Sequence, residues 1–169
     1  MATKRQAPDI LDEGSREKRD EIVELLKQAY WMEMETVMSY VANSVNPDGV
    51  RGREISEALE QDIQEELGHA QLFARRIKDL YGVVPGSMEF RAQQQSLQPP
   101  DVQTDLVHVI RGVIDAENGA IAHYNNIIEA TDGVDHATQD IVIDILRDEQ
   151  SHKRMFEGFL REFEAEHRS

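Results

Sequence analysis

Residues 145–152 read ILRDEQSH, and they lie inside a run whose apolar residues recur at spacings of three and four. That spacing is typical of an amphipathic helix. Glu149 and His152 are three residues apart, so their side chains share the apolar face of this helix. Glu66 and His69 repeat the pattern in a second apolar stripe. Two helices are therefore expected to carry a carboxylate and an imidazole into the protein interior.

The rest of the chain shows the same helical periodicity. Residues 82–103 are the exception, because they contain two glycines, three prolines and a run of glutamines, none of which suits a helix interior. Shorter turn signals separate the first helix from the second and the third from the fourth. The pattern predicts an all-α four-helix bundle with a long crossover between helices two and three. The expected helices cover residues 15–46, 53–81, 104–131 and 135–166.

The length and composition fit one globular domain. The chain has 169 residues, of which 40% are apolar and 30% are charged, and this size suffices to bury one hydrophobic core. Residues 1–18 mix charges with Pro8 and Gly14 and show no apolar period, so we expect a flexible N-terminal segment there. Residues 19–169 are expected to form the bundle domain.

Charge and residue usage exclude several classes of function. The formal charge of −15 would repel a polyanion, so no nucleic-acid partner is expected. The chain has no uncharged apolar stretch that could span a bilayer, and its start lacks the apolar core of a signal peptide. We therefore expect a cytoplasmic protein with no membrane partner. The chain has no cysteine, so any bound metal must use oxygen and nitrogen ligands.

Glutamates on the other two helices complete an internal repeat. Glu33 on the first helix and Glu117 on the third lie on the inward faces, whereas Glu35 is expected to face solvent on the opposite side of its helix. A tyrosine follows each inward glutamate by seven residues, namely Tyr40 and Tyr124. Each half of the chain therefore reads Glu, six residues, Tyr and then Glu-x-x-His, a match that chance seldom produces twice.

Four inward glutamates create a problem of charge. An unpaired carboxylate in an apolar interior costs several kcal/mol or takes up a proton. Two divalent cations would supply four positive charges, and the two imidazoles would complete their coordination. A purely structural bundle would have to bury all six polar residues without that compensation. The residues therefore predict a dinuclear metal site with open positions for oxygen or peroxide.

Over about residues 20–165 the chain resembles the bacterioferritin branch of the ferritin-like superfamily, and ILRDEQSH is close to that family's motif in helix four. The resemblance implies a ferritin-like four-helix bundle with a ferroxidase centre that holds two iron ions per subunit, with manganese as a possible replacement. Glu66 and Glu149 would bridge the two metals. The implied metal ligands, with Tyr40 beside them as a further catalytic residue, are Glu33, Glu66, His69, Glu117, Glu149 and His152.

The activity that the resemblance implies is oxidation of Fe(II) to Fe(III) by dioxygen or hydrogen peroxide in a homo-oligomer, for iron storage or detoxification. No haem is predicted, because Leu67 stands where haem-binding bacterioferritins carry a methionine. The alternatives are a di-manganese catalase or a rubrerythrin-like peroxidase at the same dinuclear site. Rubrerythrins match less well, since Ala120 replaces their second glutamate and the chain has no cysteine. DNA protection of the Dps kind is disfavoured, because Lys4 and Arg5 form only a thin basic tail.

Residues around the ligands are expected to orient them. A ligating imidazole usually gives its other N–H to a carboxylate, so Asp148 is expected to orient His69, and Glu65 to orient His152. Both tyrosines fit either a core position bonded to a ligand carboxylate or a redox role. Asp62 fits a part in passing iron inward or an ordinary solvated or pair-forming acid. The remaining histidines are expected at the surface or at helix caps, and they are His108, His123, His136 and His167.

Overall fold

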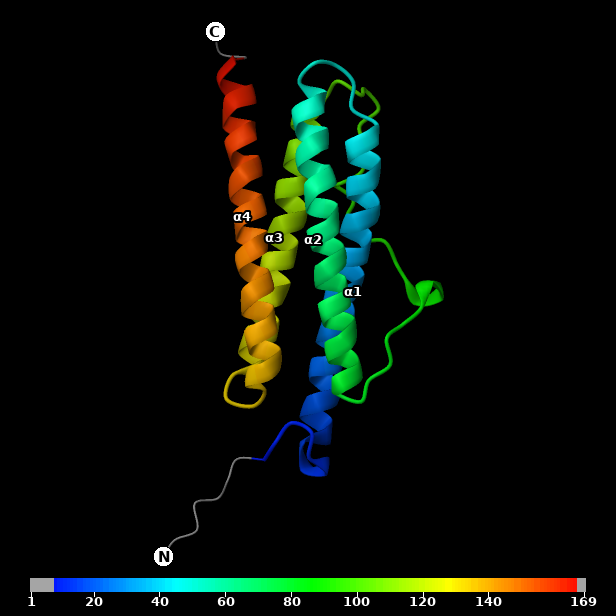
Figure 1. Cartoon of the computed structure of the whole chain (residues 1–169), viewed down its shortest axis with the longest axis vertical. Coiled ribbons are helices and arrows are strands. Elements are labelled where there is room, and N and C mark those ends of the chain that lie inside the picture. Colours follow the sequence, from blue (N-terminus) through cyan, green and yellow to red (C-terminus); the bar gives the residue numbers. More distant parts are fainter. Residues whose placement is uncertain (1–7, 167–169) are drawn as a thin grey trace, which may run out of the picture.

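The computed structural model describes residues 8–166, and within this range it contains four long α-helices and no strand (Figure 1). The predicted all-α four-helix bundle is confirmed, and the helix ends lie within two residues of those expected. The helices are α1 (Arg16–Val45), α2 (Gly52–Asp79), α3 (Leu106–Thr131) and α4 (His136–Glu166), with short 3-10 helices η1 (Glu13–Ser15) and η2 (Ser87–Glu89).

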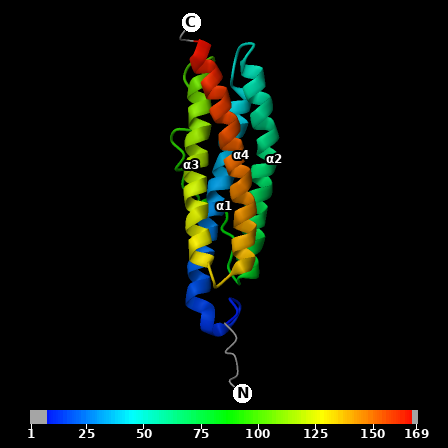
Figure 2. The same cartoon turned by 90° about the vertical axis from the view of Figure 1, so that its left-hand side faces the viewer.

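The chain forms two antiparallel helix pairs that are joined by a crossover. In Figure 1, α1 rises and α2 descends, residues 80–105 return along the outside of the bundle, and α3 then descends before α4 rises. Figure 2 shows the four helices side by side along the whole length of the molecule. The crossover therefore runs the length of the bundle, as predicted, and it makes α2 and α3 parallel.

Two apolar clusters fill the bundle, one toward each end. The first includes Leu26, Phe73 and Ile127, and the second includes Leu59 and Phe156. Their members come from all four helices, because each helix presents an apolar stripe to the other three. Along every helix the two clusters leave a short stretch between them. In this middle part of the bundle, polar side chains from all four helices turn inward.

The bundle begins earlier than the boundary expected at residue 19. Helix α1 starts at Arg16, and Ile10, which is 8% exposed, packs into the first apolar cluster. The buried Arg19 guanidinium donates to the carbonyl oxygens of Ile10 and Asp12, each at 3.0 Å. These bonds satisfy part of the buried guanidinium and hold residues 10–12 against α1. Residues 1–7 of the expected flexible segment lie outside the described residues.

The end of α2 depends on a glycine for packing. Tyr81 adopts the left-handed conformation with φ of 63°, and the next residue, Gly82, donates its N–H to the Ile77 carbonyl oxygen at 2.9 Å. A Cβ at Gly82 would lie 2.8 Å from Val23 Cγ1 on α1. Gly82 thus allows the chain to pass close to α1 as it enters the crossover, while Tyr81 makes the turn.

The middle of the crossover lies directly on α1 and α3. Leu97 is 1% exposed and belongs to the second apolar cluster, and its carbonyl oxygen accepts the Asn43 Nδ2–H at 2.8 Å. On α3, a Cβ at Gly112 would overlap the Ser96 carbonyl oxygen and lie 3.1 Å from Leu97 Cα. The crossover is therefore seated on the bundle through one buried leucine and one glycine that gives it room.

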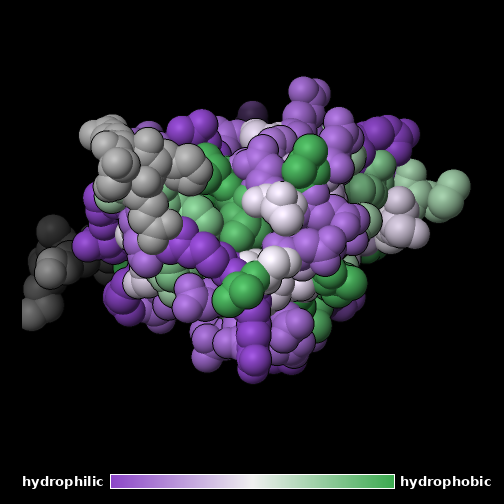
Figure 3. Space-filling model, turned by 90° about the horizontal axis from the view of Figure 1, so that it is seen from above, coloured by the Kyte–Doolittle hydropathy of each residue, from purple (hydrophilic) through white to green (hydrophobic). Residues whose placement is uncertain are grey.

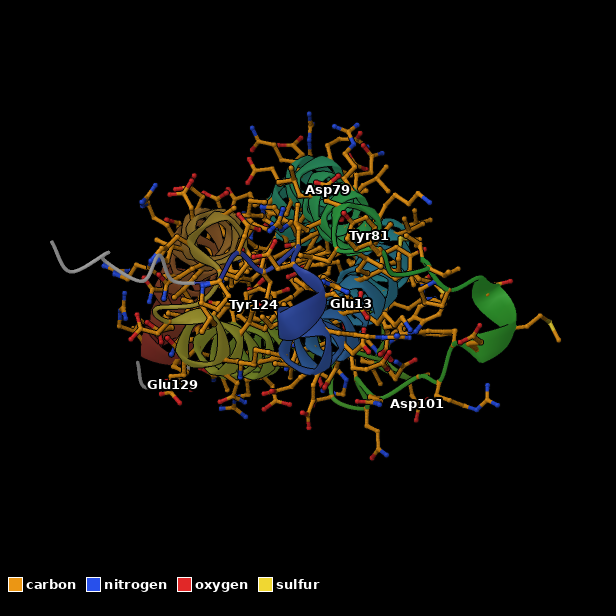
Figure 4. All side chains as sticks on the ribbon, turned by 90° about the horizontal axis from the view of Figure 1, so that it is seen from below. Glu13, Asp79, Tyr81, Asp101, Tyr124 and Glu129 are labelled. Carbon is orange, nitrogen blue, oxygen red and sulfur yellow. The ribbon has the colours of Figure 1, made fainter. Side chains whose placement is uncertain are left out.

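The surface mixes polar and apolar residues. Within residues 8–166, no helix is long and apolar enough to cross a membrane. Figure 3 views the end of the bundle where α1 leads into α2, and it shows hydrophobic side chains among hydrophilic ones; Val50 in this loop is 95% exposed. Figure 4, from the other end, shows Tyr124 among the helices and Asp79 and Glu129 toward their outside.

We expect Gly112→Ala to lower the free energy of unfolding by about 1–3 kcal/mol, because the added methyl group must displace the crossover backbone. Gly119→Ala is a matched control on the same helix, since the nearest atom to its Cβ would be Met32 Cε at 4.0 Å. The control should be neutral or should stabilise the protein by up to about 1 kcal/mol through helix propensity. Urea unfolding followed by circular dichroism measures both values. Equal stabilities of the two variants would contradict this account.

Candidate metal centre

The six residues predicted as metal ligands meet midway along the bundle, between the two apolar clusters. Helices α1 and α3 each supply one glutamate, whereas α2 and α4 each supply a Glu-x-x-His pair. All six are buried, with at most 6% of any residue exposed. The structure thus brings together the whole set, which is Glu33, Glu66, His69, Glu117, Glu149 and His152.

Their ligand atoms form two overlapping groups. In each group, one oxygen or nitrogen atom of every residue lies within 4.8 Å of those of the others. Glu66 and Glu149 belong to both groups, while each group has a glutamate and a histidine of its own. Two neighbouring cations with two bridging carboxylates would need this arrangement. The groups are Glu33, Glu66, His69 and Glu149, and Glu66, Glu117, Glu149 and His152.

Several atoms in this centre have no hydrogen-bond partner within the described part of the chain. They are both carboxylate oxygens of Glu66, Oε1 of Glu149, and Nδ1 of His69 and of His152. His69 Nδ1 lies 3.2 Å from Glu149 Oε1, and His152 Nδ1 lies 3.2 Å from Glu66 Oε1, without hydrogen-bond geometry. Since buried polar atoms are nearly always satisfied, their gathering at one point fits a pair of bound cations.

The buried charges shift the pKa values of the carboxyl groups in opposite directions. Burial, followed by the carboxylates of Glu149 and Glu66, raises the pKa of Glu33 and of Glu117 well above the usual range. Burial alone would also raise the pKa of Glu66, but the two imidazoles outweigh it and lower this pKa to about 2. Burial lowers the pKa of each imidazole, but the adjacent carboxylates outweigh it and raise the pKa. Protons and cations therefore compete for the same atoms.

Two tyrosine hydroxyls bind the outer carboxylates crosswise. Tyr40 on α1 donates to Glu117 Oε1 on α3 at 2.7 Å, and Tyr124 on α3 donates to Glu33 Oε1 on α1. Both tyrosines are fully buried, and burial raises the pKa of both phenols, so they remain protonated donors. Each hydroxyl orients a carboxylate supplied by the other helix. A redox role of Tyr40 stays a prediction.

Carboxylates outside the centre contact the outer nitrogens of both imidazoles. Asp148 Oδ2 lies 3.3 Å from His69 Nε2, and Glu65 Oε2 lies 2.9 Å from His152 Nε2. The structure thus brings both predicted pairs together across α2 and α4. Asp62 is buried, with Oδ1 at 3.7 Å from His152 Nε2, and burial raises the pKa of Asp62 to about 6. Asp62 is therefore not a solvated acid, whereas its place beside His152 fits a pair-forming acid, and a part in passing iron inward stays a prediction.

Two residues near the centre differ from expectation. Glu35, which was expected to face solvent, is only 5% exposed because the crossover covers it. His123, which was expected at the surface or at a cap, is 6% exposed, and its Nε2 lies 2.9 Å from a backbone carbonyl oxygen of α1. His108 and His136 are exposed, and His167 lies outside the described residues. Only the length of the crossover signals that part of α1 could be covered.

Comparison with known proteins places the chain in a family. A family model described as a ferritin-like domain matches residues 23–165. The chain belongs to the ferritin-like family. One curated relative of this ferritin-like protein is a DNA protection during starvation protein of Pyrococcus furiosus, 28% identical over 144 residues that cover 83% of this chain and 77% of the relative. Another is a bacterioferritin of Desulfovibrio desulfuricans, 25% identical over 147 residues that cover 86% of this chain and 78% of the relative.

Solved structures share the fold of this ferritin-like protein. A dodecameric thioferritin, the bacterioferritin-related protein from Bacteroides fragilis, superposes with a TM-score of 0.81 at 24% identity, over 89% of this chain and 90% of the other. The bacterioferritin of Desulfovibrio desulfuricans, a protein with a diiron site, superposes with a TM-score of 0.76 at 20% identity, over 89% of this chain and 84% of the other. At these identities the likeness shows the common fold alone.

Metal binding should stabilise the ferritin-like protein against heat, because cations would offset the charge of four carboxylates that are buried together. At a free Co(II) concentration a hundred times the Kd, one bound ion raises the free energy of unfolding by about 2.7 kcal/mol. Differential scanning calorimetry with Co(II) and with EDTA measures the resulting rise in Tm. Glu66→Gln should show a much smaller rise, since it removes a carboxylate from both groups. If the Tm of the wild-type protein is the same with Co(II) as with EDTA, the result would contradict a metal centre.

Asp148→Ala should weaken Co(II) binding about tenfold or more, because His69 would lose the carboxylate that contacts its outer nitrogen. Asp144→Ala is a matched control one turn away on α4, where the carboxylate pairs with Arg147 at 3.0 Å. Titration calorimetry at one ionic strength compares the two Kd values. If both variants bind Co(II) like the wild type, Asp148 does not orient the ligand.

Proposed function

We propose that this ferritin-like protein is a ferroxidase, which oxidises Fe(II) to Fe(III) at a dinuclear centre within one subunit, for iron storage or detoxification. The observation that carries the proposal is the pair of buried four-residue groups that share Glu66 and Glu149. Family membership and the curated bacterioferritin relative support the same conclusion. The proposed site residues are Glu33, Glu66, His69, Glu117, Glu149 and His152, with Tyr40 beside them.

The shared carboxylates give this arrangement its chemical capacity. They would hold two Fe(II) substrate ions side by side, so that one oxidant molecule can take an electron from each. Hydrogen peroxide, for example, accepts two electrons and two protons and leaves as two water molecules, while both irons become Fe(III). Hard carboxylate oxygens suit the more highly charged product. Manganese would fit the same donor set, because carboxylate and imidazole ligands accept both metals.

The surrounding residues would hold the ligands in place during turnover. The hydroxyls of Tyr40 and Tyr124 bind the carboxylates of Glu117 and Glu33, so neither carboxylate is free to turn away. The two apolar clusters exclude water from both ends of the centre. A dry, prearranged site strengthens electrostatic interactions with bound cations.

The proposal includes a cytoplasmic homo-oligomer that binds two iron ions per subunit and no haem. The printed description of the Bacteroides fragilis relative as dodecameric supports an assembly of subunits. The Pyrococcus furiosus relative is named for DNA protection, but the formal charge of −15 opposes direct DNA binding by this chain. Oxidation of Fe(II) would protect other molecules without such binding.

The second candidate is a di-manganese catalase or a rubrerythrin-like peroxidase, which would use the same dinuclear centre on hydrogen peroxide. The two candidates differ in what accumulates. A ferroxidase converts Fe(II) into Fe(III) in proportion to the oxidant consumed. A catalase or peroxidase turns over many equivalents of peroxide with no net oxidation of added Fe(II).

We expect wild-type protein to bind two Fe(II) per subunit without oxygen and to oxidise both when dioxygen or peroxide is added. Loss of a residue that only orients a metal ligand lowers metal affinity or activity by roughly 10–100-fold. Glu149 is itself a proposed ligand, so Glu149→Gln should slow Fe(III) formation by about a hundredfold or more. Glu129→Gln on the surface of α3 is the control and should react like the wild type. Stopped-flow absorbance measures Fe(III), and an oxygen or peroxide assay measures the oxidant. Peroxide turnover without Fe(III) would favour the second candidate.

A further inference from the structure

Glu35 lies on the side of α1 that faces away from the metal centre, beneath the crossover. Its carboxylate accepts the backbone N–H of Gln93 at 2.7 and 3.0 Å and that of Gln94 at 2.8 Å. The Gln94 side chain also donates to Thr36 Oγ1 at 2.7 Å. Glu35 therefore holds this part of the crossover on α1 together with Thr36 and Asn43, and its 5% exposure makes it a buried anchor.

The same part of the crossover is also attached to α3. The Ser96 hydroxyl donates to the Asp115 carboxylate, and the Ser96 backbone passes over Gly112 with no room for a Cβ. His108 Nε2 lies 3.0 Å from the Gln98 carbonyl oxygen. Residues 93–98 thus bridge α1 and α3 on the outside of the bundle.

The attachment points lie at the level of the metal centre. Glu35 follows Glu33 by two residues on α1, and Asp115 precedes Glu117 by two residues on α3. Residues two apart point to nearly opposite sides of a helix. Each helix therefore has one carboxylate directed into the centre and, beside it, one carboxylate bound to the crossover.

Polar bonds hold residues 93–96 of the crossover, next to the packed Leu97. A pocket of about 310 Å³ remains between the crossover and the two helices, lined by Met32, Glu35, Gln94, Ala116 and Gly119 among others. Leu97 is the deeply buried apolar residue of this stretch. Loss of the Glu35 carboxylate would leave the backbone N–H groups of Gln93 and Gln94 without this acceptor and so loosen the crossover on α1.

The spacing of α1 and α3 matters to the centre because these helices carry the two glutamates that are not shared. Glu33 belongs to one group of ligands and Glu117 to the other. The tyrosine that binds each of them comes from the opposite helix. A shift of α1 against α3 would therefore move both outer carboxylates and both of their hydrogen-bond donors.

We propose that Glu35 is a positioning residue of the metal centre, which binds the crossover across α1 and α3 and so holds Glu33 and Glu117 at the separation that two cations need. This inference rests on the proposed dinuclear function. Glu35 touches neither the cations nor the oxidant. It acts through the placement of the two helices that supply the outer carboxylates.

Co(II) binding tests the proposal, because its visible absorption reports ligand geometry and its titration gives affinity. Glu35→Ala should weaken Co(II) binding about tenfold or more and alter the absorption spectrum, as loss of an outer support does in metal sites. Glu35→Gln keeps one carbonyl acceptor and should recover part of the affinity. Glu24 is an exposed residue of α1 whose carboxylate pairs with Lys27, so Glu24→Gln should bind Co(II) with the affinity and spectrum of the wild type.

Measurements at a temperature well below every Tm separate positioning from a general loss of stability. A Glu35→Ala protein with a lower Tm but with wild-type Co(II) affinity and spectrum would overturn the proposal. If that variant does not fold, Glu35→Gln and Asp115→Asn carry the test, and wild-type affinity and spectra in both would overturn it. Wild-type protein that binds no Co(II) would instead refute the dinuclear centre itself, so the two failures are distinguishable.

Discussion

The bundle depends on how four buried carboxylates are neutralised. Glu33, Glu66, Glu117 and Glu149 lie together in the middle of an otherwise apolar interior. Ionised and unpaired, such groups would cost more than the marginal stability of a domain can offset. Protons, imidazoles and tyrosine hydroxyls relieve part of this cost, as the opposed pKa shifts of the glutamates show. Two divalent cations would offset this cost with no proton on any carboxylate. The four buried carboxylates thus destabilise the metal-free bundle and also make it able to bind metal.

The rest of the architecture makes that concentration of charge tolerable. Separate apolar clusters at the two ends of the bundle fix the helices, so the middle can be given over to polar groups. The pairing of α1 with α2 and of α3 with α4 through short loops leaves the contact between α1 and α3 to be held by other means. Inside the bundle the apolar clusters and the two tyrosine–glutamate bonds hold α1 and α3 together, and outside the bundle the crossover does.

Sequence periodicity was sufficient for the parts of this structure that follow from local rules. The four helices, the crossover and the inward Glu-x-x-His pairs repeat at helical spacing, so their faces could be predicted. Glu35 could not be placed, because its burial depends on a connection that has no period of its own. The burial of His123 could not be predicted for a similar reason, because its ring contacts a backbone carbonyl oxygen of α1, which is a different helix. Ile10 packs because Arg19 holds its backbone, a contact that no spacing predicts.

The two sides of the centre differ, and this difference follows from the chain path. On the side of α1 and α3, the crossover covers the helices and buries Glu35. On the side of α2 and α4, no segment of residues 8–166 crosses over, and the imidazoles contact Asp148 and Glu65, whose side chains are 52% and 56% exposed. The histidines therefore link the buried carboxylates to acids at the surface, whereas the outer glutamates are backed by the crossover. Because α1 and α3 contribute no histidine, their ligands depend on the two tyrosine hydroxyls and on helix placement, and helix placement is the property that the crossover controls.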